Sequence, residues 1–218
     1  MATFNEQEVF QKISATKLLP LFNYADLDVC KAVIRSCYNA GIRAFELTDR
    51  DENAFKVFEK LVPFAAAELP EMSLGAGTIL TPLTAQKYID AGADFIIAPN
   101  LDLSVGDVCI KNKVPWIPGC LTPTEFQQAF NAGAKVIKLF PAGTVGPDYV
   151  KHIRGPLPHL KIVVTGGVQV NAPAIKAWIN AGVFAAGVGS QLFSKEVIQS
   201  GNYAPVTETL TAILKELA

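Results

Sequence analysis

The stretch NAGAKVIKLFPAG, residues 131–143, combines two features that decide the fold. Its first three residues end an amphipathic helical stretch, and a polar residue followed by Ala-Gly recurs at 39–41, 90–92 and 180–182. Each copy precedes an apolar run of four to six residues. Glycine just past a helix end adopts the left-handed conformation that turns the chain into a following strand. The spacing of roughly 40 to 50 residues fits two strand–helix units per repeat.

The same alternation of apolar runs and helical stretches continues along the chain and predicts eight short strands joined by helices. Helices are expected in the intervals, with one before the first strand and one after the last; Thr81-Pro82 and the capping box 122–125 are typical helix starts. Most strands are apolar on both faces, as in a parallel sheet covered by helices. We therefore predict an α/β fold, a single (β/α)8 TIM barrel over residues 1–218 with an extra N-terminal helix, and a doubly wound open sheet as the alternative. The expected strands are 17–22, 43–48, 72–78, 94–98, 114–117, 135–140, 161–165 and 184–188.

The composition indicates a soluble protein with a large core. Half of the 218 residues are hydrophobic, 18% are charged, and the net charge is −1. Without a basic patch, neither nucleic acid nor a membrane is an expected partner. No signal-peptide pattern or long apolar run is present, so we expect a cytoplasmic location. The four cysteines and two histidines lack ligand spacing, so we expect reduced thiols and no metal site.

Lys138 interrupts the apolar run of the opening stretch. A buried ammonium is costly unless it is paired or loses its proton, and burial lowers a lysine's pKa. A neutral amine at the mouth of a barrel is a nucleophile for a carbonyl carbon, with which it forms an imine. The alternative is a buried ion pair between Lys138 and Glu46.

Polar residues also stand at the carboxyl ends of other expected strands, where active sites of such barrels lie. Because side chains alternate along a strand, Glu46, Thr48 and Arg50 share one face. Glu46 is the expected proton donor and acceptor, and Arg50 offers a forked cation for a substrate carboxylate, with Thr78 as a second donor. Phe140 is expected to pack over the carbon skeleton of the substrate.

Glycines and hydroxyls follow the last two expected strands, at 165–167 and 187–190, before a short helix. Backbone N–H groups of glycine-rich loops at this place in a barrel commonly bind phosphate, although such glycines can also serve only to make tight turns. A lysine, an acid–base carboxylate, a carboxylate clamp and a phosphate site together indicate a phosphorylated keto acid as the substrate.

Several motifs resemble those of the class I 2-keto-3-deoxy-6-phosphogluconate (KDPG) aldolases, a family that also cleaves 4-hydroxy-2-oxoglutarate. The resemblance runs in order from about residue 8 to the C-terminus, and it rests on FELTDR (45–50), GAGT (75–78), AP (98–99), PG (118–119), IKLFPA (137–142) and TGG (165–167). It implies a (β/α)8 homotrimer that produces pyruvate and glyceraldehyde 3-phosphate without a metal or another cofactor.

Matched position by position, the resemblance makes Lys138 the Schiff-base lysine and Glu46 the acid–base residue. The residues implied at the pyruvate end are Arg50, Thr78, Pro99 and Phe140. Those implied at the phosphate are Thr165, Gly166, Gly167, Gly189 and Ser190.

Some positions depart from the family pattern. Asp49 precedes Arg50 and could pair with it, although strand alternation points Asp49 outward. Asn23 follows the first strand where related phosphogalactonate aldolases have arginine, and Thr165 favours the gluconate-derived substrate. Three alternatives stay open: an aldolase for the galactonate epimer or another 2-keto-3-deoxy acid, a sugar-phosphate barrel enzyme that forms no imine, and a sugar-phosphate-binding protein.

Overall fold

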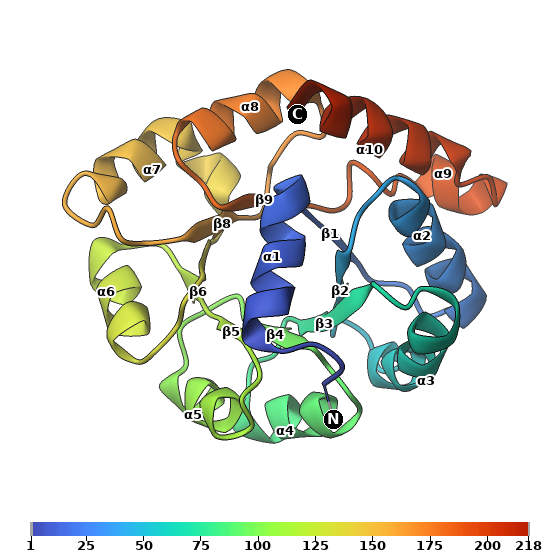
Figure 1. The fold of residues 1–218 in the computed structure, drawn as a ribbon, viewed down its shortest axis with the longest axis horizontal. Helices are drawn as coiled ribbons and strands as arrows, with labels where there is room; N and C mark the ends of the chain where they lie inside the picture. The colour runs from blue at the N-terminus through green and yellow to red at the C-terminus, as the bar shows by residue number, and fades with distance from the viewer. Residues whose placement is uncertain (1, 218) are drawn as a thin grey trace.

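A ring of parallel strands surrounded by helices forms the centre of the molecule (Figure 1). The structure, a computed structural model, describes residues 2–217. The strand order is β5-β4-β3-β2-β1-β9-β8-β7-β6, with every pair parallel, so the predicted (β/α)8 barrel is confirmed and the open-sheet alternative is wrong. The strands are β1 Leu18–Phe22, β2 Ala44–Thr48, β3 Ser73–Gly77, β4 Phe95–Ile97, β5 Trp116–Ile117, β6 Gly119–Cys120, β7 Ile137–Leu139, β8 Ile162–Val164 and β9 Ala185–Val188.

The expected fifth strand, 114–117, differs from the observed one. Strands β5 and β6 lie on either side of Pro118, which has no N–H group to donate to a sheet. Strand β5 pairs with β4, whereas β6 pairs with β7. The carbonyl oxygen of Pro118 still accepts a hydrogen bond of 2.8 Å from the N–H of Lys138. One segment, 116–120, therefore closes the barrel and changes partners at the proline.

The helices form the outer layer, apart from α1 (Figure 1). Two helices, α9 and α10, follow the last strand where one was expected, because Gly201 ends α9 in a left-handed conformation (φ 65°). The expected starts at Thr81 and Thr122 are confirmed: each side chain caps its helix, and Thr122 forms a capping box with Glu125. The helices are α1 Glu6–Thr16, α2 Leu27–Asn39, α3 Ala54–Glu68, α4 Pro82–Asp90, α5 Leu103–Lys111, α6 Pro123–Asn131, α7 Gly146–Arg154, α8 Ala172–Asn180, α9 Lys195–Ser200 and α10 Ala204–Leu217, with a 3₁₀ turn η1 at Ala142–Thr144.

The four repeated Ala-Gly phrases form the same turn. Helices α2, α4, α6 and α8 each end at the first residue of a phrase. The residue after each glycine donates its N–H to a carbonyl oxygen in the last helical turn, at 3.0–3.3 Å. This is the geometry of a Schellman cap, which needs a left-handed residue at the glycine position. The glycines, with φ between 92° and 101°, are Gly41, Gly92, Gly133 and Gly182.

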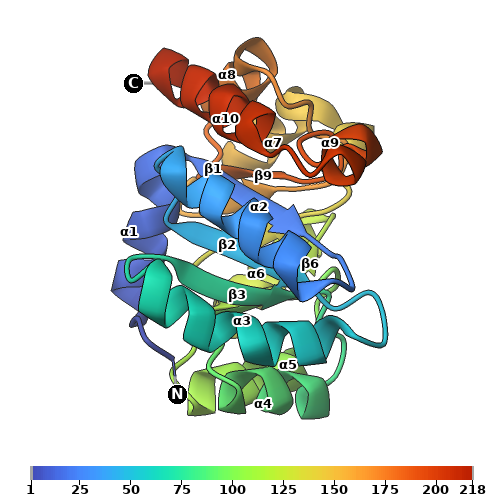
Figure 2. The same cartoon turned by 90° about the vertical axis from the view of Figure 1, so that its right-hand side faces the viewer.

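Helix α1 covers the N-terminal ends of the strands, as Figure 2 shows from the side. Val9 and Ile13 of α1 pack into an apolar cluster inside the barrel, which includes Phe95 of β4. The buried carboxyl group of Asp94 accepts hydrogen bonds from the N–H groups of Thr3, Phe4 and Leu74, at 2.6, 3.1 and 2.9 Å. The segment that leads into α1 is therefore tied to the sheet, and this end of the barrel is filled.

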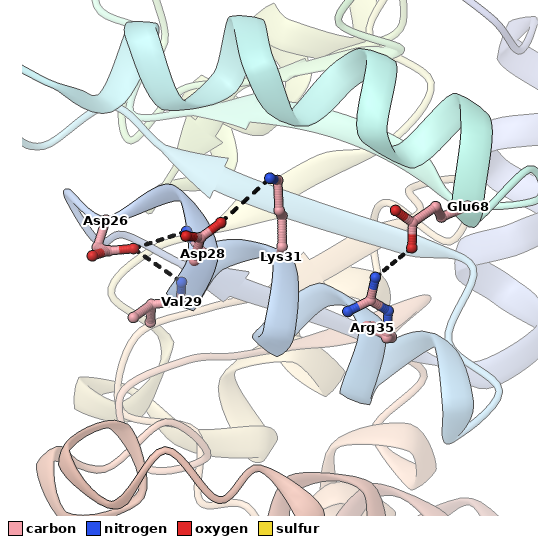
Figure 3. A network of polar contacts seen from close by, with 6 residues as sticks. All are labelled: Asp26, Asp28, Val29, Lys31, Arg35 and Glu68. Atoms are coloured by element: carbon pink, nitrogen blue, oxygen red, sulfur yellow. Dashed lines mark hydrogen bonds and ion pairs between the residues drawn. The ribbon is translucent and has the colours of Figure 1, made fainter.

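The start of α2 and its pairing with α3 fix the loop that follows β1 (Figure 3). The Asp26 carboxylate accepts hydrogen bonds from the N–H groups of Asp28 and Val29, at 2.8 and 3.2 Å, and so caps α2. An ion pair between Arg35 and Glu68 then joins α2 to α3. Because these groups are at the surface, the ion pair contributes only about 0.2–1 kcal/mol. The main consequence is that residues 23–26 run directly from the barrel mouth into a capped helix.

None of the helices described within residues 2–217 is both long and apolar enough to cross a membrane.

Candidate functional site

A cavity of about 380 Å³ opens at the carboxyl ends of the strands. Parallel strands bring residues that are far apart in the chain to this one mouth. All of the residues predicted for the pyruvate and phosphate ends line the cavity. They are Arg50, Thr78, Pro99, Phe140, Thr165, Gly166, Gly167, Gly189 and Ser190.

Lys138 lies below this cavity, in the middle of β7, with 3% of its surface exposed. Its Nζ is 4.9 Å from the ring centre of Phe140, which lines the cavity. Burial lowers the pKa of Lys138, the Glu46 carboxylate opposes this by raising it, and the Arg50 cation lowers it further. The amine is therefore biased toward the neutral, nucleophilic form.

Glu46 of β2 is 1% exposed and lies against the glycine end of β3. A Cβ atom added to Gly77 would come within 1.7 Å of Oε1 of Glu46, so only glycine leaves room for this carboxyl group. Burial raises the pKa of Glu46, whereas the charges of Lys138 and Arg50 lower it. Oε1 is buried without a hydrogen-bond partner, so it has the capacity to accept a proton or a hydrogen bond from a reacting group.

The interpretation of Lys138 and Glu46 as a closed ion pair does not describe the structure. Within residues 2–217, their nitrogen and oxygen atoms do not come within 4.0 Å of each other, although their charges influence each other's pKa. Each group therefore keeps its polar atoms available. Two buried groups of opposite charge that influence each other's pKa without pairing suit proton transfer during a reaction at a carbonyl carbon.

Arg50 and Thr78 form the polar edge of the mouth, as predicted. Nε of Arg50 donates a hydrogen bond to Oγ1 of Thr78 at 3.3 Å. Thr78 has φ 64°, an unusual and strained conformation for a β-branched residue, and such residues cluster at functional sites. The charge of Asp49 acts on Tyr88 of α4, whose pKa is raised first by burial and then by this carboxylate. Asp49 forms no ion pair with Arg50 within residues 2–217, and Arg50 lines the cavity.

The loops after β8 and β9 form the opposite side of the mouth. Gly166 and Gly167 have φ 87° and 76°. The carbonyl oxygens of Thr165 and Gly166 accept hydrogen bonds from the N–H groups of Ala142 and Gly143, at 2.9 and 2.7 Å. The loop is thus held through its carbonyl groups, whereas the N–H groups of residues 166, 167 and 190 make no backbone hydrogen bonds within the described chain. Free N–H groups beside small residues suit the binding of an anion.

Three further residues line the cavity that the sequence analysis did not mention, Leu21, Val168 and Gln191, together with Gly187 of the predicted glycine-rich segment 187–190. Gly187 leaves room for Thr165, since an added Cβ would lie 2.4 Å from its Oγ1. Gln191 directly follows Ser190, so the position of the loop is a signal that could have identified it. Leu21 gives no such signal, because all five residues of β1 are apolar or proline and buried.

Comparison with known proteins agrees with this geometry. The chain matches the family model for KDPG and KHG aldolases over residues 9–209. It is 29% identical over 200 residues to a 2-dehydro-3-deoxy-phosphogluconate aldolase of Treponema pallidum, covering 91% of this chain and 92% of that protein. It is 36% identical over 121 residues to a 2-dehydro-3-deoxy-6-phosphogalactonate aldolase of Escherichia coli, covering 55% and 58% of the two chains.

The fold also matches solved structures. The crystal structure of a KDPG aldolase from Legionella pneumophila, with pyruvate captured as a covalent carbinolamine intermediate, superposes with a TM-score of 0.84 at 27% identity. The match covers 94% of this chain and 97% of the other. The barrel and its order of elements are therefore those of a known class of enzyme structures.

Proposed function

Because the chain belongs to the family of KDPG and KHG aldolases, which are lyases, we propose that it is a class I aldolase for a phosphorylated 2-keto-3-deoxy acid. The proposed substrate is 2-dehydro-3-deoxy-6-phosphogluconate, which is cleaved to pyruvate and glyceraldehyde 3-phosphate. Cleavage of 4-hydroxy-2-oxoglutarate to pyruvate and glyoxylate is a second proposed activity. The observation that carries this proposal is the buried Lys138 amine, whose pKa is influenced by the buried Glu46 carboxylate although the two form no ion pair within residues 2–217.

In the proposed mechanism, the neutral Lys138 amine attacks the C2 ketone of the substrate. Glu46 protonates the carbinolamine oxygen, water leaves, and a protonated imine remains. Removal of the proton from the C4 hydroxyl then breaks the C3–C4 bond, the electron pair moves into the imine, and the aldehyde leaves. Protonation of the resulting enamine at C3, followed by attack of water at C2, releases pyruvate and restores the amine.

The two ends of the substrate are held by opposite sides of the mouth. Arg50 binds the carboxylate through its forked guanidinium, with the Thr78 hydroxyl beside it. Pro99 and Phe140 enclose the pyruvate carbons, and the Phe140 ring, whose centre is 4.9 Å from Nζ of Lys138, lies beside the reacting carbon. The phosphate binds the free N–H groups and hydroxyls of the loops at 165–167 and 189–190.

The configuration at C4 distinguishes the gluconate-derived acid from its galactonate epimer. Thr165 lines the mouth and supports the gluconate-derived substrate, since it brings a hydroxyl group to a position where an apolar residue would bring none. The galactonate epimer is the second candidate, because the chain also resembles a phosphogalactonate aldolase over 121 residues. The homotrimer stays a prediction; the exposed Leu83, Leu103 and Ile110 on α4 and α5 are consistent with contacts between copies.

Trapping with pyruvate and borohydride tests the proposal directly. Reduction of an imine between pyruvate and the protein leaves a permanent adduct, which peptide mass spectrometry locates. We expect the adduct on Lys138, and we expect Lys138→Met to lose it and to lower kcat by about four orders of magnitude or more.

Lys161→Met is the matched control, because Lys161 precedes the neighbouring strand β8 at the other end of the barrel and also lies near an aromatic ring, Phe184. It should keep both the adduct and turnover. An unmodified Lys138 in an active wild-type protein would rule out the imine mechanism and favour an enzyme that uses Lys138 only as a cation. A protein that binds the sugar phosphate but turns over none of the candidate acids would instead support a binding protein.

A further inference from the structure

Gln191 lies in the turn that follows β9, and it has no role in the function proposed above. It lines the cavity next to Ser190, at the end of the mouth assigned to the phosphate. The residues that line this end, 165–168, 187 and 189–191, are neutral, and the cation of the cavity lining is Arg50, which is assigned to the carboxylate. Binding of a phosphate at this end therefore depends on hydrogen-bond donors rather than on an ion pair.

The turn that carries Gln191 is fixed by its neighbours. The carbonyl oxygen of Gly189 accepts hydrogen bonds from the N–H groups of Leu192 and Phe193, at 2.8 and 3.2 Å. Leu192 and Phe193 are buried, and the ring of Phe193 packs against that of Phe22 in β1 with centres 5.0 Å apart. Gln191 itself is exposed. Its backbone is therefore held in place, while its side chain is accessible to a ligand.

The side-chain amide of Gln191 joins the two loops that form the phosphate end. Its Oε1 accepts a hydrogen bond from the N–H of Val170, in the loop after β8, at 3.3 Å. Because a backbone N–H can only donate, the amide oxygen must face Val170. This is the one hydrogen bond that the side chain of Gln191 makes within residues 2–217. The amide thus retains the two N–H donors of its NH2 group.

The contact with Val170 holds the far end of the loop after β8. The near end is held by the turn η1, which donates two N–H groups to carbonyl oxygens of this loop, at 2.9 and 2.7 Å. The two backbones are in close contact, since a Cβ atom added to Gly143 would lie 2.8 Å from Cα of Gly167. The loop is therefore attached at both ends, and the second attachment also orients the Gln191 amide.

We propose that Gln191 is a substrate-binding residue whose NH2 group donates hydrogen bonds to the phosphate and so sets the preference for phosphorylated acids. The inference rests on the proposed function, which places the phosphate at this end of the mouth, and it adds a side-chain donor to the backbone N–H groups there. Hydrogen bonds to a charged oxygen are about twice as strong as those to a neutral one. The same donors therefore favour a phosphate over the hydroxyl group of an unphosphorylated acid.

The experiment compares kcat/KM for 2-dehydro-3-deoxy-6-phosphogluconate with kcat/KM for unphosphorylated 2-dehydro-3-deoxygluconate, which has the same carbon skeleton. The ratio of the two values measures what the phosphate contributes. Gln191→Ala removes the donors and should lower the ratio by about 10-fold or more, chiefly by raising KM for the phosphorylated acid.

Two further variants separate the donor from the acceptor of the amide. Gln191→Lys supplies N–H donors but cannot accept from Val170, and it should keep the ratio at or above that of wild type. Gln191→Glu can still accept from Val170 but brings a negative charge to the phosphate, so it should lower the ratio more than Gln191→Ala does. If Gln191 served only to tie the two loops together, the Glu variant would keep the ratio and the Lys variant would lower it.

The same three substitutions at Gln169 are the matched controls, because Gln169 is exposed in the loop after β8 and does not line the cavity. They should give ratios close to that of wild type. The proposal is overturned if the three Gln191 variants keep the wild-type ratio, if the Lys and Glu variants show the reversed order, or if the wild type does not distinguish the two acids. A wild type that forms no pyruvate adduct would instead contradict the proposed function itself, so the two failures are distinguishable.

Discussion

Gly75 and Gly77 of β3 both face into the barrel, yet they make room for very different neighbours. A Cβ atom on Gly75 would lie 2.1 Å from the ring of Phe95, which belongs to the apolar cluster beneath α1. A Cβ atom on Gly77 would lie 1.7 Å from the carboxyl oxygen of Glu46. Two residues along one strand thus separate two levels of the barrel interior. The lower level is the apolar cluster around Phe95, and the upper level contains the buried polar group of Glu46.

The difference shows how one barrel can be both stable and reactive. At the lower level, apolar side chains fill the interior and α1 covers them, so burial there stabilises the fold. At the upper level, Glu46 and Lys138 are as deeply buried but form no ion-pair contact, an arrangement that costs free energy. The packed level holds the strands in place while the upper level retains groups with perturbed pKa values.

Substitution of Gly77 should produce the largest effect and should affect activity. Gly77→Ala forces the Glu46 carboxyl group to move, and losing a positioned acid–base group lowers kcat by about 10²- to 10⁴-fold. The carboxyl end of a glutamate can shift at little cost, so the melting temperature should change little. Steady-state kinetics and thermal unfolding monitored by circular dichroism measure the two quantities. Wild-type kcat in Gly77→Ala would show that the position of Glu46 is unimportant.

The same substitution two residues earlier should affect stability instead. Gly75→Ala inserts a methyl group against the ring of Phe95 in a close-packed cluster, and overpacking of this kind costs about 1–3 kcal/mol of unfolding free energy. Urea unfolding should show the loss. The fraction that remains folded should still form the pyruvate adduct at Lys138. If Gly75→Ala and Gly77→Ala behave alike, the two levels of the barrel do not have separate roles.

The pH dependence of adduct formation should give a smaller effect, in opposite directions for two variants. Because burial lowers the pKa of Lys138, trapping with pyruvate should speed up with rising pH and reach its plateau below the ordinary lysine pKa of 10.5. The Glu46 charge raises this pKa, so Glu46→Gln should move the rising limb to lower pH. Arg50 lowers it, so Arg50→Gln should move the limb to higher pH. Shifts of the same sign in both variants would contradict the electrostatic account of the upper level.

Much of the fold and of the candidate site could be predicted because both depend on local patterns. The apolar runs located the strands, and the Ala-Gly turns located four helix ends. Alternation within β2, together with the convergence of parallel strands, was enough to place Arg50 and Thr78 beside each other. These features depend on the regular spacing of side chains along helices and strands, which can be read directly from the sequence.

The remainder depends on distances between segments that are far apart in sequence. The break at Pro118 is visible as a proline, but its effect on strand pairing depends on which neighbours β5 and β6 meet. The need for glycine at 77 likewise depends on packing between β2 and β3, because an added Cβ would lie 1.7 Å from Oε1 of Glu46.

Helix α1 covers the N-terminal ends of the strands, at the end of the barrel opposite the candidate site. Because the apolar cluster fills this end of the barrel, the candidate site opens to solvent at the C-terminal mouth. In an aldol cleavage, the aldehyde fragment lies between the trapped three-carbon fragment and this opening. It must leave first, and the water that frees the enzyme must enter by the route it vacated. On the proposed function, the covalent bond to the pyruvate fragment and the position of the mouth together set the order of product release.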